Sequence, residues 1–111
     1  MNKKIEFKYG DEDYTLEYNR DSVIFMESQG FDLRQIQTKS VTMLDILWKG
    51  AFYKNHRKVK IDKIEEIYRN ISNKEDLHAG LIEMLNETYV SLLADNDDVE
   101  DNSKNIKWKM S

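Results

Sequence analysis

The sequence predicts an α+β domain in which an N-terminal β-hairpin packs against a bundle of four to five α-helices. Three observations support this fold class. Apolar and polar residues alternate over the first 18 residues, apolar residues recur at three- and four-residue steps from residue 19 to residue 94, and the composition becomes acidic at residue 95. We therefore expect one globular domain, residues 1–94, followed by a flexible acidic tail, residues 95–111. A length of 111 residues suits one domain with one core.

The first two predicted elements are the strands of the hairpin. Large apolar residues alternate with polar ones in two runs that would share one face: Ile5, Phe7 and Tyr9, then Tyr14, Leu16 and Tyr18. The polar residues 10–13 between the two runs are typical of a turn. Because an isolated hairpin is only marginally stable in water, we expect this face to pack on the helices.

The most apolar stretch, residues 41–53, is predicted to be the central helix. Its apolar residues follow helical spacing over most of the circumference: Val41, Met43, Leu44, Ile46, Leu47, Trp48, Ala51, Phe52 and Tyr53. A helix of this kind usually has neighbours on several sides. Ser40 or Thr42 is a candidate to cap its first turn. Gly50 within it indicates close packing or a bend, because glycine in a helix costs roughly 1 kcal/mol relative to alanine.

The segment before the central helix is predicted to hold one helix and one short helical turn. Asn19 or Asp21 is suited to cap the first helix, and Gly30 stands where a helix C-terminus favours glycine. Residues 31–36 form a small apolar cluster that fits a single helical turn.

Two further helices are predicted after residue 60. Residues 62–65 and residues 72–75 resemble capping boxes, with an oxygen-bearing side chain three positions before a glutamate. The inward positions of these helices are Ile61, Ile64, Ile67, Tyr68 and Ile71, then Leu77, Leu81, Met84, Leu85, Tyr89 and Leu92. His78 stands alone on the last helix, so we expect a structural role for it.

Residues 54–60 form the only dense basic cluster in the chain. Two interpretations remain open. The cluster is either a solvated loop that follows a helix C-terminus, where cations are favoured, or a surface for phosphate or an acidic partner. His56 within it is expected to be exposed and not to bind a metal.

The tail combines an acidic run with an apolar end. Residues 95–101 contain five acidic residues in seven, and the apolar residues Ile106, Trp108 and Met110 then alternate with polar ones. An edge of this kind either docks on a partner, as an added strand or in a groove, or folds back on its own domain.

Nothing in the sequence marks a catalytic, cofactor or metal site. The chain has no cysteine, and its four glycines are too far apart for a phosphate-binding loop. The net charge of −4 argues against general nucleic-acid binding, which depends on neutralising phosphates. No apolar segment approaches the roughly 20 residues of a membrane span. We therefore expect a protein that is not an enzyme, needs no cofactor or metal, and does not enter a membrane.

Residues 14–93 resemble the small tail assembly chaperones of long-tailed bacteriophages and related prophage elements. The similar features are the strand at residues 14–18 followed by a helix that closes near Gly30, the apolar central helix with residues 47–51, and the helix start at residues 59–67. The leucine-rich last helix also fits that family.

The resemblance implies a non-enzymatic role in tail assembly. Such chaperones bind the tail tape measure protein in the bacterial host cytoplasm, help recruit tail tube subunits, and are absent from the finished virion. The candidate partner-binding residues are Trp48, Phe52, Ile106, Trp108 and Met110. The alternative is a small regulatory or DNA-associated protein of a mobile element, which would use residues 54–60. The sequence leaves the oligomeric state, and the existence of a longer frameshifted product, open.

Overall fold

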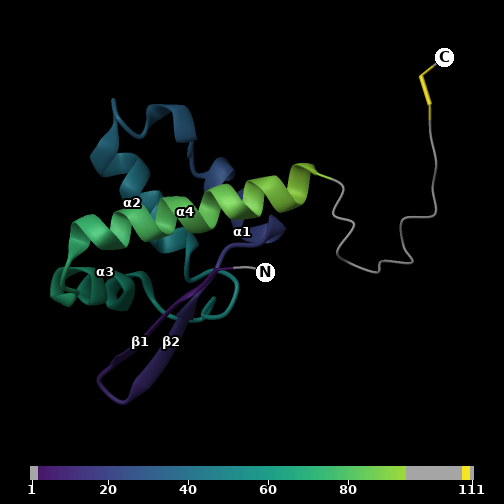
Figure 1. Cartoon of the computed structure of the whole chain (residues 1–111). Coiled ribbons are helices and arrows are strands. Elements are labelled where there is room, and N and C mark those ends of the chain that lie inside the picture. Colours follow the sequence, from purple (N-terminus) through teal and green to yellow (C-terminus); the bar gives the residue numbers. More distant parts are fainter. Residues whose placement is uncertain (1–2, 95–108, 111) are drawn as a thin grey trace.

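The computed structural model of the chain describes residues 3–94 and 109–110. Its described part confirms the α+β prediction, with an antiparallel hairpin followed by four α-helices (Figure 1). The elements in chain order are β1 (Ile5–Tyr9), β2 (Glu12–Leu16), α1 (Arg20–Ser28), the 3-10 turn η1 (Leu33–Gln35), α2 (Ser40–Gly50), α3 (Ile61–Asn70) and α4 (Lys74–Leu93). None of the described helices combines the length and the apolar character that crossing a bilayer requires.

The hairpin has the predicted apolar face but a shorter turn. Ile5 pairs with Leu16 and Phe7 with Tyr14, so the predicted face is confirmed. Strand β2 begins at Glu12, which pairs with Tyr9, and this leaves only two residues in the turn instead of four. The first turn residue, Gly10, has a positive φ of 61°. Two-residue hairpin turns need such a backbone to match the twist of the strands.

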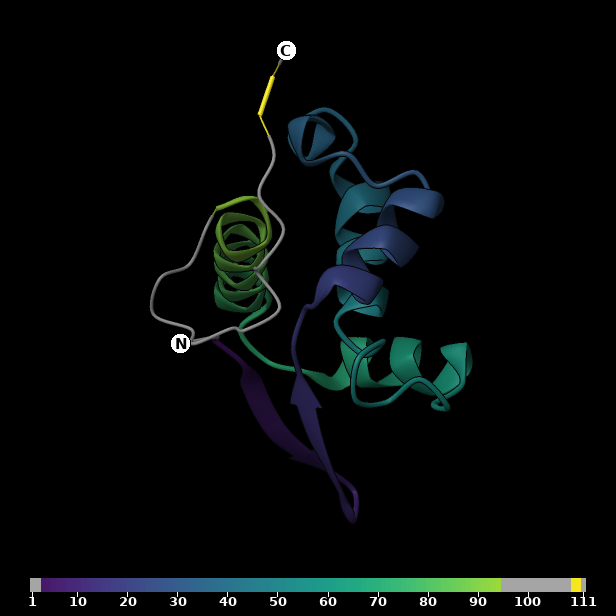
Figure 2. The ribbon, with the colours of Figure 1, turned by 90° about the vertical axis from the view of Figure 1, so that its right-hand side faces the viewer.

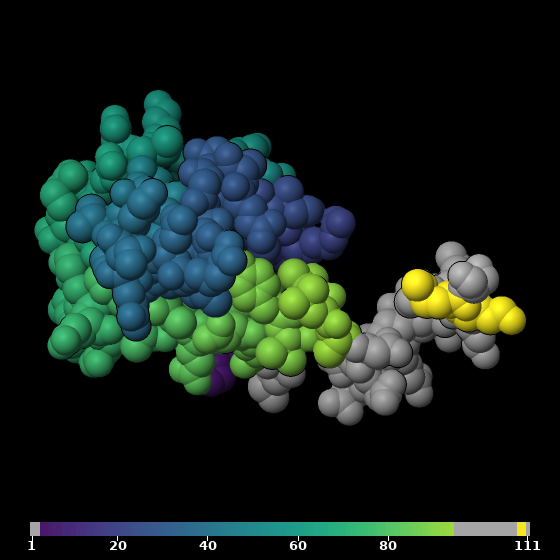
Figure 3. Space-filling model, turned by 90° about the horizontal axis from the view of Figure 1, so that it is seen from above, coloured from purple at the N-terminus to yellow at the C-terminus, as the bar shows by residue number. Residues whose placement is uncertain are grey.

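The core lies between two groups of helices. Helix α4 runs along one side of the molecule, and α1 and α2 lie on the other (Figure 2). The segment between α1 and α2, in blue, lies beside the light-green end of α4 (Figure 3). Side chains from β2 and from four helices fill the space between them and are almost completely buried: Leu16, Met26, Leu47, Ile67, Leu81 and Leu85.

Helix α2 is central, as predicted, but it is shorter and less evenly buried. It ends at Gly50, and residues 51–55 continue as turns. A Cβ on Gly50 would overlap the side chain of the fully buried Met26, so this glycine marks the close packing of α1 on α2. Val41, predicted to face inward, is 86% exposed. The first helical residue is Ser40, whose hydroxyl donates to the carbonyl oxygen of Ile36 and caps nothing.

The predicted helix starts are confirmed only for α1. Asn19 caps that helix through a reciprocal pair of hydrogen bonds with Ser22. The predicted capping boxes of α3 and α4 are wrong, because neither N-cap residue makes a side-chain cap bond. The chain enters α4 through Asn73, whose left-handed φ of 54° turns it sharply out of α3 and replaces a capped approach. Leu92, predicted to face inward, is 42% exposed near the end of α4.

Candidate functional site

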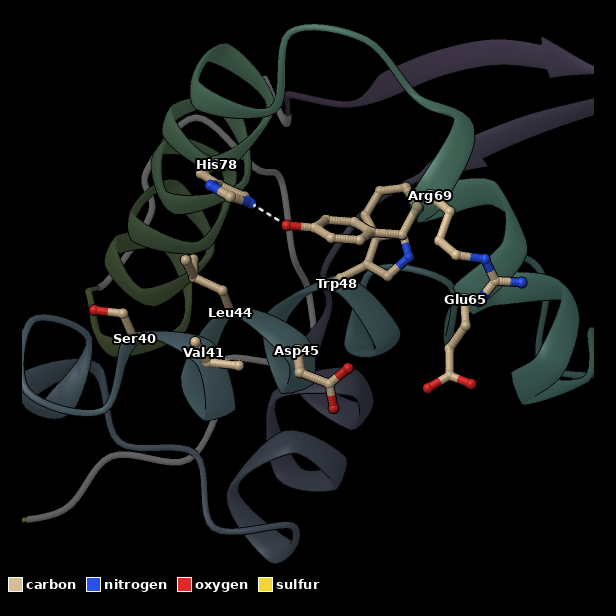
Figure 4. Close-up of a pocket in the computed structure, with 9 residues that line it drawn as sticks. Ser40, Val41, Leu44, Asp45, Trp48, Glu65, Arg69 and His78 are labelled. Carbon is tan, nitrogen blue, oxygen red and sulfur yellow. Dashed lines mark hydrogen bonds between the residues drawn. The ribbon is translucent and has the colours of Figure 1, made fainter.

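A hollow of about 440 Å3 opens between α2, α3 and the first turns of α4 (Figure 4). We call it the α2/α3 cleft. Its walls are mostly apolar, and a few charged side chains stand around them. The residues that line it are Ser40, Val41, Leu44, Asp45, Trp48, Glu65, Tyr68, Arg69 and His78. The volume lies in the range of ligand-binding pockets.

Trp48 forms the floor of the cleft. Its side chain is 2% exposed, and its Nε1–H donates a hydrogen bond of 3.0 Å to the carbonyl oxygen of Ile64. That bond satisfies the only polar group of the indole and fixes the ring against α3. The Tyr68 ring lies 5.6 Å from the indole, and the Phe52 ring lies 4.9 Å from it on the core side. Trp48 therefore joins the core to the cleft wall.

A tyrosine and a histidine close one end of the cleft. The hydroxyl of Tyr68 and Nε2 of His78 are 2.7 Å apart, and the two rings stack with centroids 6.0 Å apart (Figure 4). Partial burial, with a smaller contribution from the nearby Lys74 ammonium, lowers the pKa of His78 below its usual value. A neutral imidazole can accept a hydrogen bond from the tyrosine hydroxyl, so this bond fixes the position of the Tyr68 ring in the cleft wall.

A lysine on α2 forms ion pairs with two carboxylates that line the cleft, one on α2 and one on α3. Lys49 Nζ lies 3.0 Å from Asp45 Oδ2 and 3.8 Å from Glu65 Oε2. Exposed pairs of this kind add little stability, so their main effect is to keep the rim polar and solvated. Val41 stands at the mouth with 86% of its surface exposed. The cleft thus offers apolar surface inside a charged rim.

A continuous series of aromatic contacts connects the hairpin to the cleft. Phe7 stacks on Tyr14 at 5.2 Å, Tyr14 meets Phe52 edge-on at 6.0 Å, and Phe52 meets Trp48. Aromatic pairs at such distances add roughly 0.5–1.5 kcal/mol beyond their burial. The floor of the cleft is therefore held in place by the sheet as well as by its own helix.

The basic loop, residues 54–60, is tied to strand β2. Nε2 of His56 accepts a hydrogen bond of 2.9 Å from the backbone N–H of Thr15, and its ring lies 5.0 Å from that of Tyr14. The Asn55 amide donates to the carbonyl oxygen of Thr15 at 3.0 Å. The prediction of an exposed His56 was wrong: the side chain is half-buried because the edge of β2 supplies a backbone donor that needs an acceptor.

A second hollow, of about 450 Å3, shares the lining residue Asp45 with the α2/α3 cleft. We call it the loop hollow. It is bounded by α1, α2, the basic loop and the start of α3, and Asp45 lines both hollows. Its apolar lining comes mainly from Phe25, Ile46, Phe52, Tyr53, Val59, Ile61 and Ile64.

The structure places the predicted partner-binding residues unevenly. Trp48 and Phe52 are 2% and 1% exposed, so neither projects from the surface, although each lines one hollow. Ile106 and Trp108 lie outside the described residues, and Met110 is 86% exposed. Sequence reasoning did not place Val41 and Tyr68 on the wall of a cleft, because both belong to apolar series that predict a buried helical face.

The serine hydroxyl and the imidazole that line the α2/α3 cleft are each bonded to another partner and not to one another. The Ser40 hydroxyl donates to a backbone carbonyl, and His78 is paired with Tyr68, so the two do not form a nucleophile and base. Within residues 3–94 and 109–110, histidine and acidic side chains do not gather in groups of three that could hold a metal ion.

The fold and the cleft define a small α+β domain with an open, mostly apolar cleft between α2 and α3. A family model described as a domain of unknown function, DUF5055, matches residues 1–111, and the chain therefore belongs to that family. Neither a curated protein nor a solved structure matches the chain.

Proposed function

We propose that this protein is a non-enzymatic tail assembly chaperone. In this proposal it binds apolar helical segments of the tape measure protein in the α2/α3 cleft, helps recruit tail tube subunits, and acts in the cytoplasm of the bacterial host. Two things support it: the resemblance of residues 14–93 to that family, and an apolar cleft that no element of the described chain covers. The uncovered apolar cleft is the structural observation on which the proposal depends.

The cleft has the form that an amphipathic helix can fill. A helix docks by placing side chains at positions i, i+3, i+4 and i+7 into an apolar groove. Here Val41 and Leu44, one turn apart on α2, form one wall, and Tyr68 forms the wall opposite. Full burial of an exposed valine is worth roughly 1.5–3 kcal/mol, so Val41 would contribute to client affinity without supporting the fold.

The sharpest test compares two exposed valines on helices. Val41→Asp puts a charge in the mouth of the cleft, whereas Val90→Asp makes the same change on α4, outside it; the two valines are 86% and 67% exposed. We expect Val41→Asp to weaken binding of the full chain to the tape measure protein of the same phage or prophage by about tenfold or more, because the lost burial exceeds roughly 1.4 kcal/mol. Val90→Asp should bind as the wild type does.

Binding can be measured by co-purification after co-expression and by titration of the soluble complex, with thermal melting to check that both variants fold. Equal affinities for the two variants would remove the cleft from the proposal. Absence of any complex between the wild-type chain and the tape measure protein would remove the chaperone role itself.

The alternative of a DNA-associated regulator has weaker support. It would use the basic loop, but Lys54 there is ion-paired with Glu17 at 3.0 Å, and the Arg57 guanidinium lies 4.1 Å from the centre of the Tyr53 ring. Lys58 and Lys60 are exposed. Two exposed lysines are few for phosphate contacts that must hold a duplex at physiological salt.

A further inference from the structure

The two edges of the hairpin differ in how their backbone groups are bonded. The segment after α2 closes the free edge of β2: the backbone N–H of Thr15 donates to His56 Nε2 at 2.9 Å, and its carbonyl oxygen accepts from the Asn55 amide at 3.0 Å. Two residues further on, the backbone N–H of Glu17 donates to the carbonyl oxygen of Ala51 at 3.3 Å. That segment lies beside β2 in both ribbon views (Figures 1 and 2). The chain therefore completes one edge of its own sheet.

The opposite edge, formed by β1, is open. Thr15 directs its backbone groups away from β1, so its cross-strand partner Glu6 directs its own away from β2, as antiparallel pairing requires. Lys8, two positions further along β1, does the same. Within residues 3–94 and 109–110, no hydrogen bond reaches these outward backbone groups of Glu6 and Lys8. A row of outward donors and acceptors of this kind is a template for pairing with a further strand.

The side chains along this edge are complementary to those of a second copy. Glu6 and Lys8 are exposed, whereas Ile5, Phe7 and Tyr9 are half-buried on the other face of the strand. Two copies of β1 paired antiparallel about Phe7 would place Glu6 of each copy opposite Lys8 of the other. Unlike charges directly opposite each other stabilise a strand pair. A register about Glu6 would set Glu6 against itself, and like charges in that position are destabilising.

The register about Phe7 is also the one that uses the whole strand. It pairs residues 5–9 of one copy with the same residues of the other in reverse order. A register about Ile5 would oppose unlike charges too, but it would extend to Lys3, which precedes β1. The backbone N–H of Lys3 already donates to the Glu87 carboxylate at 2.7 Å.

The aromatic residue at the centre of β1 favours the same contact. Phe7 would meet its own copy as a non-hydrogen-bonded pair, in which side chains on adjacent strands come closest. Its ring already stacks on that of Tyr14 at 5.2 Å, so the pairing would continue the row of rings across both hairpins. Aromatic pairs across strands stabilise a sheet.

We propose that two copies of this protein associate through β1, antiparallel about Phe7, and join their hairpins into one four-stranded sheet. The strand order is β2, β1, β1, β2, so both open edges are removed and both closed edges lie outside. None of the residues that line the α2/α3 cleft belongs to the hairpin, so this association does not depend on the proposed function.

Charge reversal on the full chain tests the register. Lys8→Glu and Glu6→Lys each set like charges opposite one another in both symmetry-related pairs, and each should raise the dimer dissociation constant about tenfold or more. The double variant Glu6→Lys, Lys8→Glu restores unlike pairs and should return the constant close to that of the wild type. Sedimentation equilibrium at low salt measures all three constants, and thermal melting checks that every variant folds.

The matched control is Lys58→Glu, which makes the same charge change at an exposed lysine outside the hairpin. It should dimerise as the wild type does. Amide exchange then locates the contact. The N–H groups of Ile5, Phe7 and Tyr9 face β2 and should be protected at every protein concentration, whereas those of Glu6 and Lys8 should gain protection only as the dimer forms.

Three results would overturn the proposal. The first is a wild-type chain that stays monomeric at millimolar concentration. The second is a dimer that withstands the single charge reversals or is not restored by the double one. The third is protection of the Glu6 and Lys8 amides that does not change with concentration, which would assign the open edge to a segment of the same chain.

Discussion

The junction between the hairpin and the helices and the α2/α3 cleft are built from the same kinds of side chain. The junction contains Tyr14, Phe52 and His56, and the cleft contains a tyrosine, a tryptophan and a histidine in similar contact. The junction is closed: Tyr14 is 4% and Phe52 1% exposed. In the cleft the Trp48 ring is covered, but the space beside it stays open (Figure 4).

The difference lies in what each histidine is bonded to. His56 accepts a backbone N–H from β2, so an element of the sheet covers the rings on that side. His78 pairs with the side chain of Tyr68, and within the described residues both side chains line the open cleft. Aromatic content therefore does not distinguish the closed junction from the open cleft, whereas the presence of a covering element does.

The largest expected effect contrasts the two regions directly. Phe52→Ala removes a ring that contacts Tyr14 and Trp48 inside the closed junction, and it should lower the free energy of unfolding by about 3–5 kcal/mol. Leu44→Ala, in the half-open cleft wall, should cost at most about 2 kcal/mol, because less surface is buried there. Urea unfolding measures both values. Equal losses would show that the cleft is packed as tightly as the junction.

A pair of glycine substitutions tests the packing tightness on the closed side. Gly50→Ala should destabilise by about 1–3 kcal/mol, because the new methyl group overlaps the buried Met26 side chain. Gly80→Ala should stabilise by up to about 1 kcal/mol through helix propensity, since its Cβ would meet only Ile5 Cδ1, at 3.5 Å. Thermal melting of the two variants should therefore move in opposite directions, and a gain for Gly50→Ala would contradict the close contact of α1 with α2.

The smallest effect concerns the imidazole on the open side. The pKa of His78 is lowered in the folded state, chiefly by burial and further by Lys74, so protonation favours the unfolded chain. Its stabilising contribution is complete above about pH 6.5, the pKa of an unfolded histidine, and is lost as the pH falls toward the folded value. Unfolding free energies measured between about pH 7.5 and pH 5 should thus fall less steeply in His78→Gln than in the wild type. Parallel pH curves for the wild type and His78→Gln would show that folding leaves the pKa of His78 unshifted, as for a side chain in full contact with water.

Some local signals predicted the structure well, and others did not. Alternation placed Ile5, Phe7 and Leu16 on one face, because period two is a property of any extended strand. Asn19, one of the two predicted candidates, caps α1, since its short side chain reaches the backbone of the next turn. The predicted caps of α3 and α4 failed, because the tight connection between the two helices sets the backbone at Asn73. A pattern of residue types does not contain that constraint.

The sequence by itself determined the hairpin, the central helix and the absence of cysteine chemistry, because each depends on neighbours within a few positions or on composition. Only the tertiary structure decided that Val41 is uncovered while Phe52 is sealed, and that His56 serves the hairpin while His78 borders a cleft. Periodicity gives the side of a helix on which a residue lies. Whether that side is covered depends on segments distant in the chain, whose placement no local pattern specifies.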